Sequence, residues 1–97
     1  MTAYNVVRFK VKPGKETEVM QVWKEAPVPS GAAKGCVVKT GDHAYCFIGE
    51  WDSMDSIAAA RPEMIAQLDR VRPLLEDLGD GLGVTDPVSG EVVLSLR

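Results

Sequence analysis

Few side chains in this sequence could take or give a proton near neutral pH. His43 is the only histidine, and it stands next to Gly41-Asp42, a pair of residues typical of a hairpin turn, so we expect it to be an exposed surface group. Glu50 and Asp69 are the other candidate bases. Glu50 alternates onto the sheet face opposite the aromatic residues of its own strand, and Asp69 fits the polar side of a helix. The spacing of these groups gives no Ser-His-Asp, Cys-His or paired-carboxylate arrangement.

A second group of residues could bind a small molecule without taking or giving a proton. Asn5 shares one face of the first predicted strand with Phe9, and its amide could donate a hydrogen bond to an oxyanion. The alternative is an asparagine that satisfies a neighbouring strand end. Trp51 shares a face with Tyr45 and Phe47, where its indole would form either a large wall with one N–H donor or an ordinary part of the core.

The two cysteines, Cys36 and Cys46, lack the C-x-x-C spacing and the histidine cluster of a zinc site. With Gly41-Asp42 as the turn, Thr40 pairs with His43 and Cys36 with Phe47. This register predicts that the cysteines lie on opposite sheet faces, so we expect two free thiols and no metal site.

Periodicity and turn residues divide the chain into seven elements. Strands are predicted at 4–11, 36–40, 43–51 and 91–96. Helices are predicted at 16–25, from 53 to before Arg61, and, with a kink, from about Pro62 to Leu78. A loop is predicted at 27–34 and a turn at 86–90. If the two later helices count as one element, the order is βαββαβ. This order predicts a ferredoxin-like α+β fold with an antiparallel four-stranded sheet and two helices on one face. A length of 97 residues suits one domain, 1–97.

Two helices cover only one face of such a sheet, yet apolar residues alternate onto both faces. The predicted uncovered face holds Val6, Val37, Cys46 and Ile48, with one face of the last strand. A patch of this kind is more than a soluble monomer normally exposes, so we expect a homodimer built through the sheet face that the helices leave open.

The composition is that of a soluble globular protein, with 45% apolar and 26% charged residues. The net charge of −3 argues against binding to nucleic acid or to an anionic membrane, because both require clustered Lys and Arg. Apolar runs are far shorter than a membrane span, and the first residues open directly into a strand pattern. A cytoplasmic location is therefore expected.

Two blocks of the sequence resemble the antibiotic biosynthesis monooxygenase (ABM) superfamily. The segment from Val6 to Glu16, with Trp23 after it, is similar to the start of these proteins, and the segment from Phe47 to Ser53 is similar to their third strand and the entry to their second helix. The resemblance implies a dimeric α+β barrel with a ligand between sheet and helices. In the haem-degrading branch it also implies an asparagine on the first strand, a ligand-facing tryptophan at the place of Trp51, and an iron-binding histidine on the second helix. Residues 53–78 contain no histidine, so haem degradation is not expected.

The resemblance, together with an apolar sheet face that ends in polar groups, therefore implies a cofactor-independent monooxygenase that acts on a small aromatic or quinol-like molecule. Asn5 and Trp51 are its candidate catalytic residues, and Phe9, Tyr45 and Phe47 its candidate ligand-binding residues. The alternative is a dimeric ligand-binding or structural protein without catalysis. A continuous pocket between sheet and helices would favour the enzyme, and a filled interior would favour the alternative.

Overall fold

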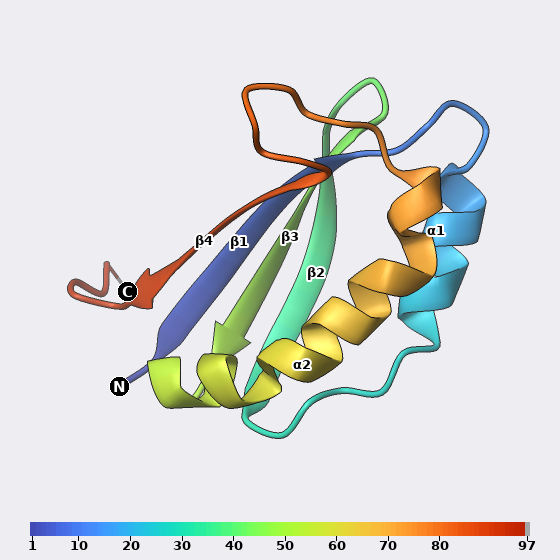
Figure 1. Ribbon diagram of the computed structural model, residues 1–97. Coiled ribbons are helices and arrows are strands. Elements are labelled where there is room, and N and C mark those ends of the chain that lie inside the picture. The colour runs from blue at the N-terminus through green and yellow to red at the C-terminus, as the bar shows by residue number, and fades with distance from the viewer. Residues whose placement is uncertain (97) are drawn as a thin grey trace.

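The computed structural model describes residues 1–96 and shows a four-stranded antiparallel sheet with both α-helices on one side (Figure 1). The strands are β1 (Ala3–Lys10), β2 (Ala32–Gly41), β3 (Ala44–Trp51) and β4 (Thr85–Glu91), and the helices are α1 (Glu16–Lys24) and α2 (Met54–Val71), followed by a 3₁₀ turn, η1 (Arg72–Leu74). The order across the sheet is β2-β3-β1-β4. The predicted ferredoxin-like arrangement is confirmed.

Alternation along β1 decides which side chains meet the helices. Ala3, Asn5 and Phe9 are buried under the helices, whereas Tyr4 and Arg8 are exposed on the opposite side, which we call the open face. Successive strand residues point to opposite faces, so every second residue of β1 belongs to the core.

The predicted register of the hairpin is wrong by one residue. Gly41 pairs with Ala44, so the turn is Asp42-His43, with His43 at a positive φ of 59°. A bulge between Lys39 and Gly41 adds an extra residue to β2, and Val37 rather than Cys36 lies opposite Phe47. The extra residue could not be predicted from Gly41-Asp42, because those two residues alone favour a regular two-residue turn.

This shift moves every β2 side chain to the other face of the sheet. Val37 packs against the core under the helices and is not part of the open face, where we had predicted it. Cys36 lies opposite Ile48, and Val38 lies opposite Cys46, so the two cysteines share the open face instead of lying on opposite faces. Both are nevertheless free, Cys36 exposed and Cys46 buried.

One continuous helix replaces the two helices predicted between 53 and Leu78, and it ends earlier than predicted. Ser53 caps α2 by accepting a hydrogen bond from the backbone N–H of Ser56, and the helix then continues through Pro62 to Val71. Pro62 lies inside the helix without ending it, and Figure 1 shows that α2 curves along its length. Pro73 falls in the 3₁₀ turn, so the helix ends before it and does not reach Leu78.

The last strand also differs from the prediction. Residues 86–90, predicted as a turn, lie within β4, and most of the predicted strand 91–96 forms a tail beyond the sheet. A proline such as Pro87 is tolerated here because β4 is an edge strand, which leaves one row of backbone groups without a ladder partner. The predicted loop 27–34 is likewise shorter, because β2 begins at Ala32.

Candidate functional site

A buried polar pair lies between the sheet and α2. The indole Nε1 of Trp51 donates a hydrogen bond of 2.7 Å to Oδ1 of Asn5. Both residues are almost completely buried, with 3% of Trp51 and 6% of Asn5 exposed. The apolar residues around them are Ala3, Ile57 and Ala60. The structure therefore brings the two candidate catalytic residues into direct contact in an apolar environment.

This hydrogen bond fixes how the Asn5 amide is oriented. An indole N–H can only donate, so the amide atom facing Trp51 must be the oxygen, and the NH₂ group must point the other way. There, Nδ2 of Asn5 donates to the thioether sulfur of Met64 on α2, at 3.9 Å. A thioether is a weak acceptor, so the amide directs its donors at a place where a charged oxygen would bind more strongly.

Gly49 makes room for the pair. It lies opposite Asn5 in the pairing of β1 with β3. A Cβ atom on Gly49 would be 2.6 Å from Asn5 Oδ1 and 2.9 Å from Trp51 Nε1. Both distances are shorter than van der Waals contact allows, so any side chain at position 49 would push the hydrogen-bonded atoms apart.

The three predicted ligand-binding residues separate into two places. Phe47 borders the polar pair, because its ring would lie 3.0 Å from a Cβ atom on Gly49. Phe9 and Tyr45 are two rows further along the sheet, where their rings stack with centroids 5.7 Å apart. The rings of Trp23 and Phe9 also pack at nearly a right angle, with their centroids 5.0 Å apart. Phe9, Tyr45 and Phe47 thus all belong to the main apolar core, and Phe47 is the one whose ring reaches the space beside Gly49 next to the polar pair.

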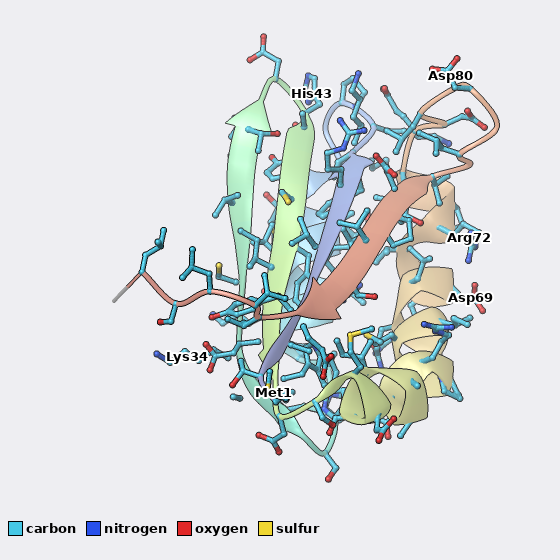
Figure 2. All side chains as sticks on the ribbon, turned by 90° about the vertical axis from the view of Figure 1, so that its left-hand side faces the viewer. Met1, Lys34, His43, Asp69, Arg72 and Asp80 are labelled. Atoms are coloured by element: carbon cyan, nitrogen blue, oxygen red, sulfur yellow. The ribbon has the colours of Figure 1, made fainter. Side chains whose placement is uncertain are left out.

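The candidate bases all lie away from the pair. His43 is at the opposite end of the sheet and is only partly exposed, contrary to our expectation of a free surface group (Figure 2). Its Nδ1 is 2.6 Å from Oε2 of Glu16 at the start of α1. A backbone hydrogen bond at Glu16 itself, and then the hydrogen bond with His43, lower the pKa of this carboxyl.

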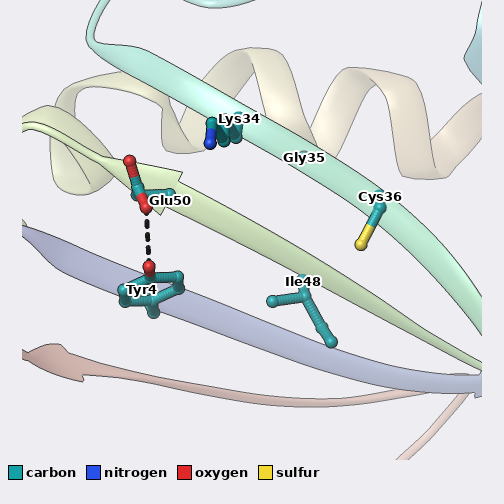
Figure 3. A pocket seen from close by; sticks show the side chains of 6 residues that line it. All are labelled: Tyr4, Lys34, Gly35, Cys36, Ile48 and Glu50. Carbon is teal, nitrogen blue, oxygen red and sulfur yellow. Dashed lines mark hydrogen bonds between the residues drawn. The ribbon is translucent and has the colours of Figure 1, made fainter. Parts of the chain in front are cut away.

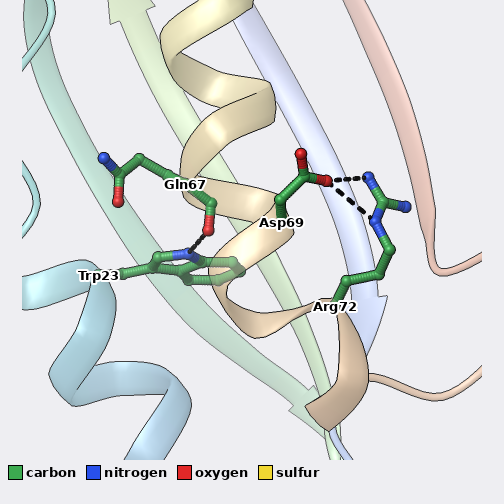
Figure 4. Close-up of polar contacts among 4 residues, drawn as sticks. All are labelled: Trp23, Gln67, Asp69 and Arg72. Carbon is green, nitrogen blue, oxygen red and sulfur yellow. Dashed lines mark hydrogen bonds and ion pairs between the residues drawn. The ribbon is translucent and has the colours of Figure 1, made fainter.

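The two carboxylates considered from the sequence also have surface partners. Asp69 accepts hydrogen bonds from the guanidinium of Arg72, as Figure 4 shows, and both side chains are about half exposed. Glu50 is on the open face, where it accepts a hydrogen bond of 2.6 Å from the hydroxyl of Tyr4. This hydrogen bond raises the pKa of Tyr4.

Sequence reasoning missed two residues of this site, Gly49 and Met64. Gly49 could have been noticed, because a glycine inside a strand often marks a close approach of other groups. Met64 carries no such signal, since a methionine in the apolar stripe of a helix is normally core.

The open face is hollowed near its Trp51 end. Six residues line a hollow of about 500 Å³, in which the side chains of Tyr4, Glu50 and Lys34 lie near the end of β3 (Figure 3); the lining residues are Tyr4, Lys34, Gly35, Cys36, Ile48 and Glu50. A neighbouring hollow of about 480 Å³ lies between Tyr4 and the C-terminal tail. Figure 2 shows this tail crossing in front of the strands.

Two further kinds of site, metal centres and membrane-spanning helices, are absent from residues 1–96. His, Cys, Asp and Glu side chains do not gather there into a group of three that could hold a metal ion. In the same residues, none of the helices is long and apolar enough to cross a bilayer.

The model of one protein family, antibiotic biosynthesis monooxygenase, matches residues 2–62, which is more than half of the chain. The chain belongs to this family. A search of curated protein sequences found no significant match.

Solved structures show how widely this ABM fold is shared. The chain is similar to SnoaB, a cofactor-independent oxygenase from Streptomyces nogalater, with a TM-score of 0.71 and 18% identity over 98% of this chain and 96% of that one. It is also similar to a protein of unknown function from Nitrosomonas europaea, with a TM-score of 0.72 and 16% identity over 97% and 91% of the two chains. A conserved protein from Methanosarcina mazei gives a TM-score of 0.67 and 20% identity over 94% and 92%. At such identities the likeness establishes the fold and leaves the reaction open.

Proposed function

We propose that this protein is a cofactor-independent monooxygenase of small aromatic or quinol-like molecules, with its site at Asn5 and Trp51. The observation that carries the proposal is the orientation of the Asn5 amide. Trp51 holds its oxygen, so its NH₂ group is presented to whatever lies on the α2 side. Family membership and the likeness to a cofactor-independent oxygenase support the same reaction class.

The chemistry uses the electrons of the substrate. A phenol or an enolisable ketone loses a proton, and its anion reduces O₂; an anthrone-type CH₂ group becomes C=O while the second oxygen atom leaves as water. The Asn5 amide stabilises the anion by a charge-assisted hydrogen bond in surroundings that exclude water. His43 lies at the other end of the sheet, so a substrate that is itself acidic fits this site best.

In this mechanism Trp51 acts through Asn5. Its N–H bond is already used by Asn5 Oδ1, so Trp51 positions the amide and walls the site rather than donating to the ligand itself. Phe47 is the aromatic residue best placed to contact a ligand. Phe9 and Tyr45 support the site from the core.

Oxygen uptake with dihydroxyaromatic compounds and with dithranol, an anthrone, tests the proposal. Asn5→Ala should lower kcat/KM by roughly 10²- to 10³-fold, the usual effect of losing one donor to an oxyanion. Trp51→Phe should lower it less, because the amide remains but is no longer held. Lys24→Ala, at an exposed position on α1, is the control and should change nothing. Equal rates for all four proteins would contradict the assignment.

One observation favours the second candidate, a dimeric binding or structural protein without catalysis. Asn5 and Trp51 are covered by protein atoms, so the helix side is filled at this place. If no compound of the panel supports oxygen uptake above a buffer blank, this candidate replaces the enzyme.

We also propose that the protein is a homodimer through its open face. Large apolar side chains remain exposed there, with Val88 63% exposed and Val38 and Tyr4 more than one third exposed. The tail adds Val93, 96% exposed, and Leu94. A second copy of the same face would cover these residues and contribute roughly 25 cal/mol per Å² of apolar surface buried.

Light scattering of wild type and of Ile48→Asp tests the dimer. Wild type should show twice the chain mass of 10.5 kDa, and the aspartate should dissociate the dimer or unfold the subunit, because an unpaired carboxylate is costly to bury. Lys34, which we had placed in a loop, lies in β2 and lines the open-face hollow. The matched control is therefore Arg61→Asp, on the exposed side of α2. A wild-type mass of one chain at micromolar concentration would contradict the dimer.

A further inference from the structure

We propose that Met64 is a movable plug whose sulfur occupies the place of the substrate's oxygen, so that a ligand enters by displacing this side chain from the Asn5 amide. The inference rests on the proposed function, because it takes Asn5 as the group that binds an anionic oxygen. It adds the residue that controls entry to the site.

The first argument is the mismatch between donor and acceptor. Nδ2 of Asn5 is a strong donor in an apolar interior, and the acceptor it has is a thioether at 3.9 Å. Exchange of that sulfur for a phenolate or enolate oxygen would replace a weak hydrogen bond by a charge-assisted one. A ligand oxygen would therefore form a stronger hydrogen bond with the Asn5 amide than the sulfur of Met64 does.

The second argument is the position of Met64 on the helix. Its side chain packs against the buried cluster of Ala3, Trp51, Ile57 and Ala60 but is itself only partly buried. Its chain neighbours Glu63 and Ile65 are exposed. The sulfur thus contacts the buried amide from a side chain that is not fully covered, and we take this place as the route of entry.

The third argument is flexibility. Methionine is unbranched and has three side-chain torsions between Cα and its methyl group, so it can leave one packing position for another at small cost. Trp51 and Asn5 are fixed by their mutual hydrogen bond and by the lack of space at Gly49. Of the groups at this site, Met64 is the one whose movement opens a cavity without breaking the pair.

The binding test uses 4-nitrophenol, whose anion absorbs visible light. Met64→Ala removes the plug, so the apparent Kd should fall at least tenfold, as expected when the open state no longer has to compete with a closed one. Met64→Leu keeps the volume but is branched and less flexible, and it should bind more weakly than wild type. In the double variant Asn5→Ala/Met64→Ala, the preference for the phenolate over the phenol should disappear.

A measurement on the wild-type chain covers the case in which Met64→Ala does not fold. With ¹³C-methyl-labelled methionine, the four methionines give four methyl signals, and Met64→Leu identifies the one that belongs to Met64. Addition of 4-nitrophenol should shift the Met64 methyl signal and leave that of Met20, on α1, unchanged. An unchanged Met64 signal at saturating probe would overturn the plug, as would absence of any binding to wild type and Met64→Ala.

These outcomes distinguish failure of the Met64 proposal from failure of the monooxygenase proposal. If the Met64 signal shifts but no substrate is oxidised, the plug stands and the monooxygenase proposal fails. If oxidation depends on Asn5 while the Met64 signal and the Kd of both Met64 variants stay as in wild type, the monooxygenase stands and the plug fails.

Discussion

The two ends of the helix-covered sheet face are built on different principles. At the His43 end, Phe9 packs with Val11, Val19, Val71 and Leu75 in a purely apolar cluster. At the other end, Ala3, Trp51, Ile57 and Ala60 form a smaller cluster around the Asn5 amide. The first end packs both helices against the sheet, and the second packs α2 against the sheet around a buried polar group. A buried amide with a weak acceptor is a feature that stability alone does not require, and it points to binding.

The largest expected effect comes from truncation at the apolar end. Phe9→Ala would remove a ring that contacts both Trp23 and Tyr45 and would leave a cavity, at a cost of about 3–5 kcal/mol in the free energy of unfolding. Urea unfolding measures this as a lower midpoint. Val28→Ala, in an exposed loop, should change the free energy by less than about 0.5 kcal/mol. A cost below about 1 kcal/mol for Phe9→Ala would mean that this end is not the main core.

A smaller effect is expected when the polar end is crowded. Gly49→Ala puts a methyl group 2.6 Å from Asn5 Oδ1, and overpacking of this kind costs about 1–3 kcal/mol. Gly35 is the matched control, because its Cβ would meet Phe47 at an acceptable 3.4 Å. Asn5→Ala removes the oxygen that the new methyl group would meet. The double variant Asn5→Ala/Gly49→Ala should therefore lose less free energy of unfolding than the two single changes added together. If the free energies of the two single changes simply add in the double variant, the methyl group at position 49 does not clash with Asn5.

The smallest effect concerns the ion pair at the His43 end. The pKa of Glu16 is lowered in the folded chain, so its contribution to stability is complete above its ordinary value of 4.5 and is lost as pH falls through the lower folded value. The difference in urea midpoint between wild type and Glu16→Gln should therefore be present above pH 4.5 and vanish in acid, below the lowered pKa of Glu16. Glu18→Gln, at a nearby exposed position, serves as the control. A difference that persists unchanged in strong acid, where this carboxyl is protonated, would contradict the lowered pKa of Glu16.

The sequence predicted the element order, and with it the fold, because each element has its own pattern. It failed where a pattern is local but the structure is decided by neighbours. Pro87 and Gly90 indicate a turn unless the strand is known to lie at a sheet edge, and the bulge before Gly41 depends on the pairing of β2 with β3. The face of Cys36 was wrong for this reason.

For the site, the sequence offered the residues but not their contacts. Alternation placed Asn5 and Trp51 on the same sheet face, and the family resemblance indicated both positions as candidates. The hydrogen bond between them needs Trp51 to lean back over Gly49 toward the next strand, and that depends on side-chain torsions that no spacing encodes. Met64 joins the site only through the packing of α2.

The two tryptophans give each end of the molecule its own optical reporter. Trp23 donates to the backbone oxygen of Gln67, and so reports on the contact between α1 and α2 (Figure 4), whereas Trp51 donates to Asn5. In Trp51→Phe all indole fluorescence comes from the Phe9 end, and in Trp23→Phe all of it comes from the Asn5 end. Quenching by iodide or by a bound nitroaromatic compound can then be assigned to one end directly, so ligand entry and loosening of the helices can be followed as separate events in the same protein.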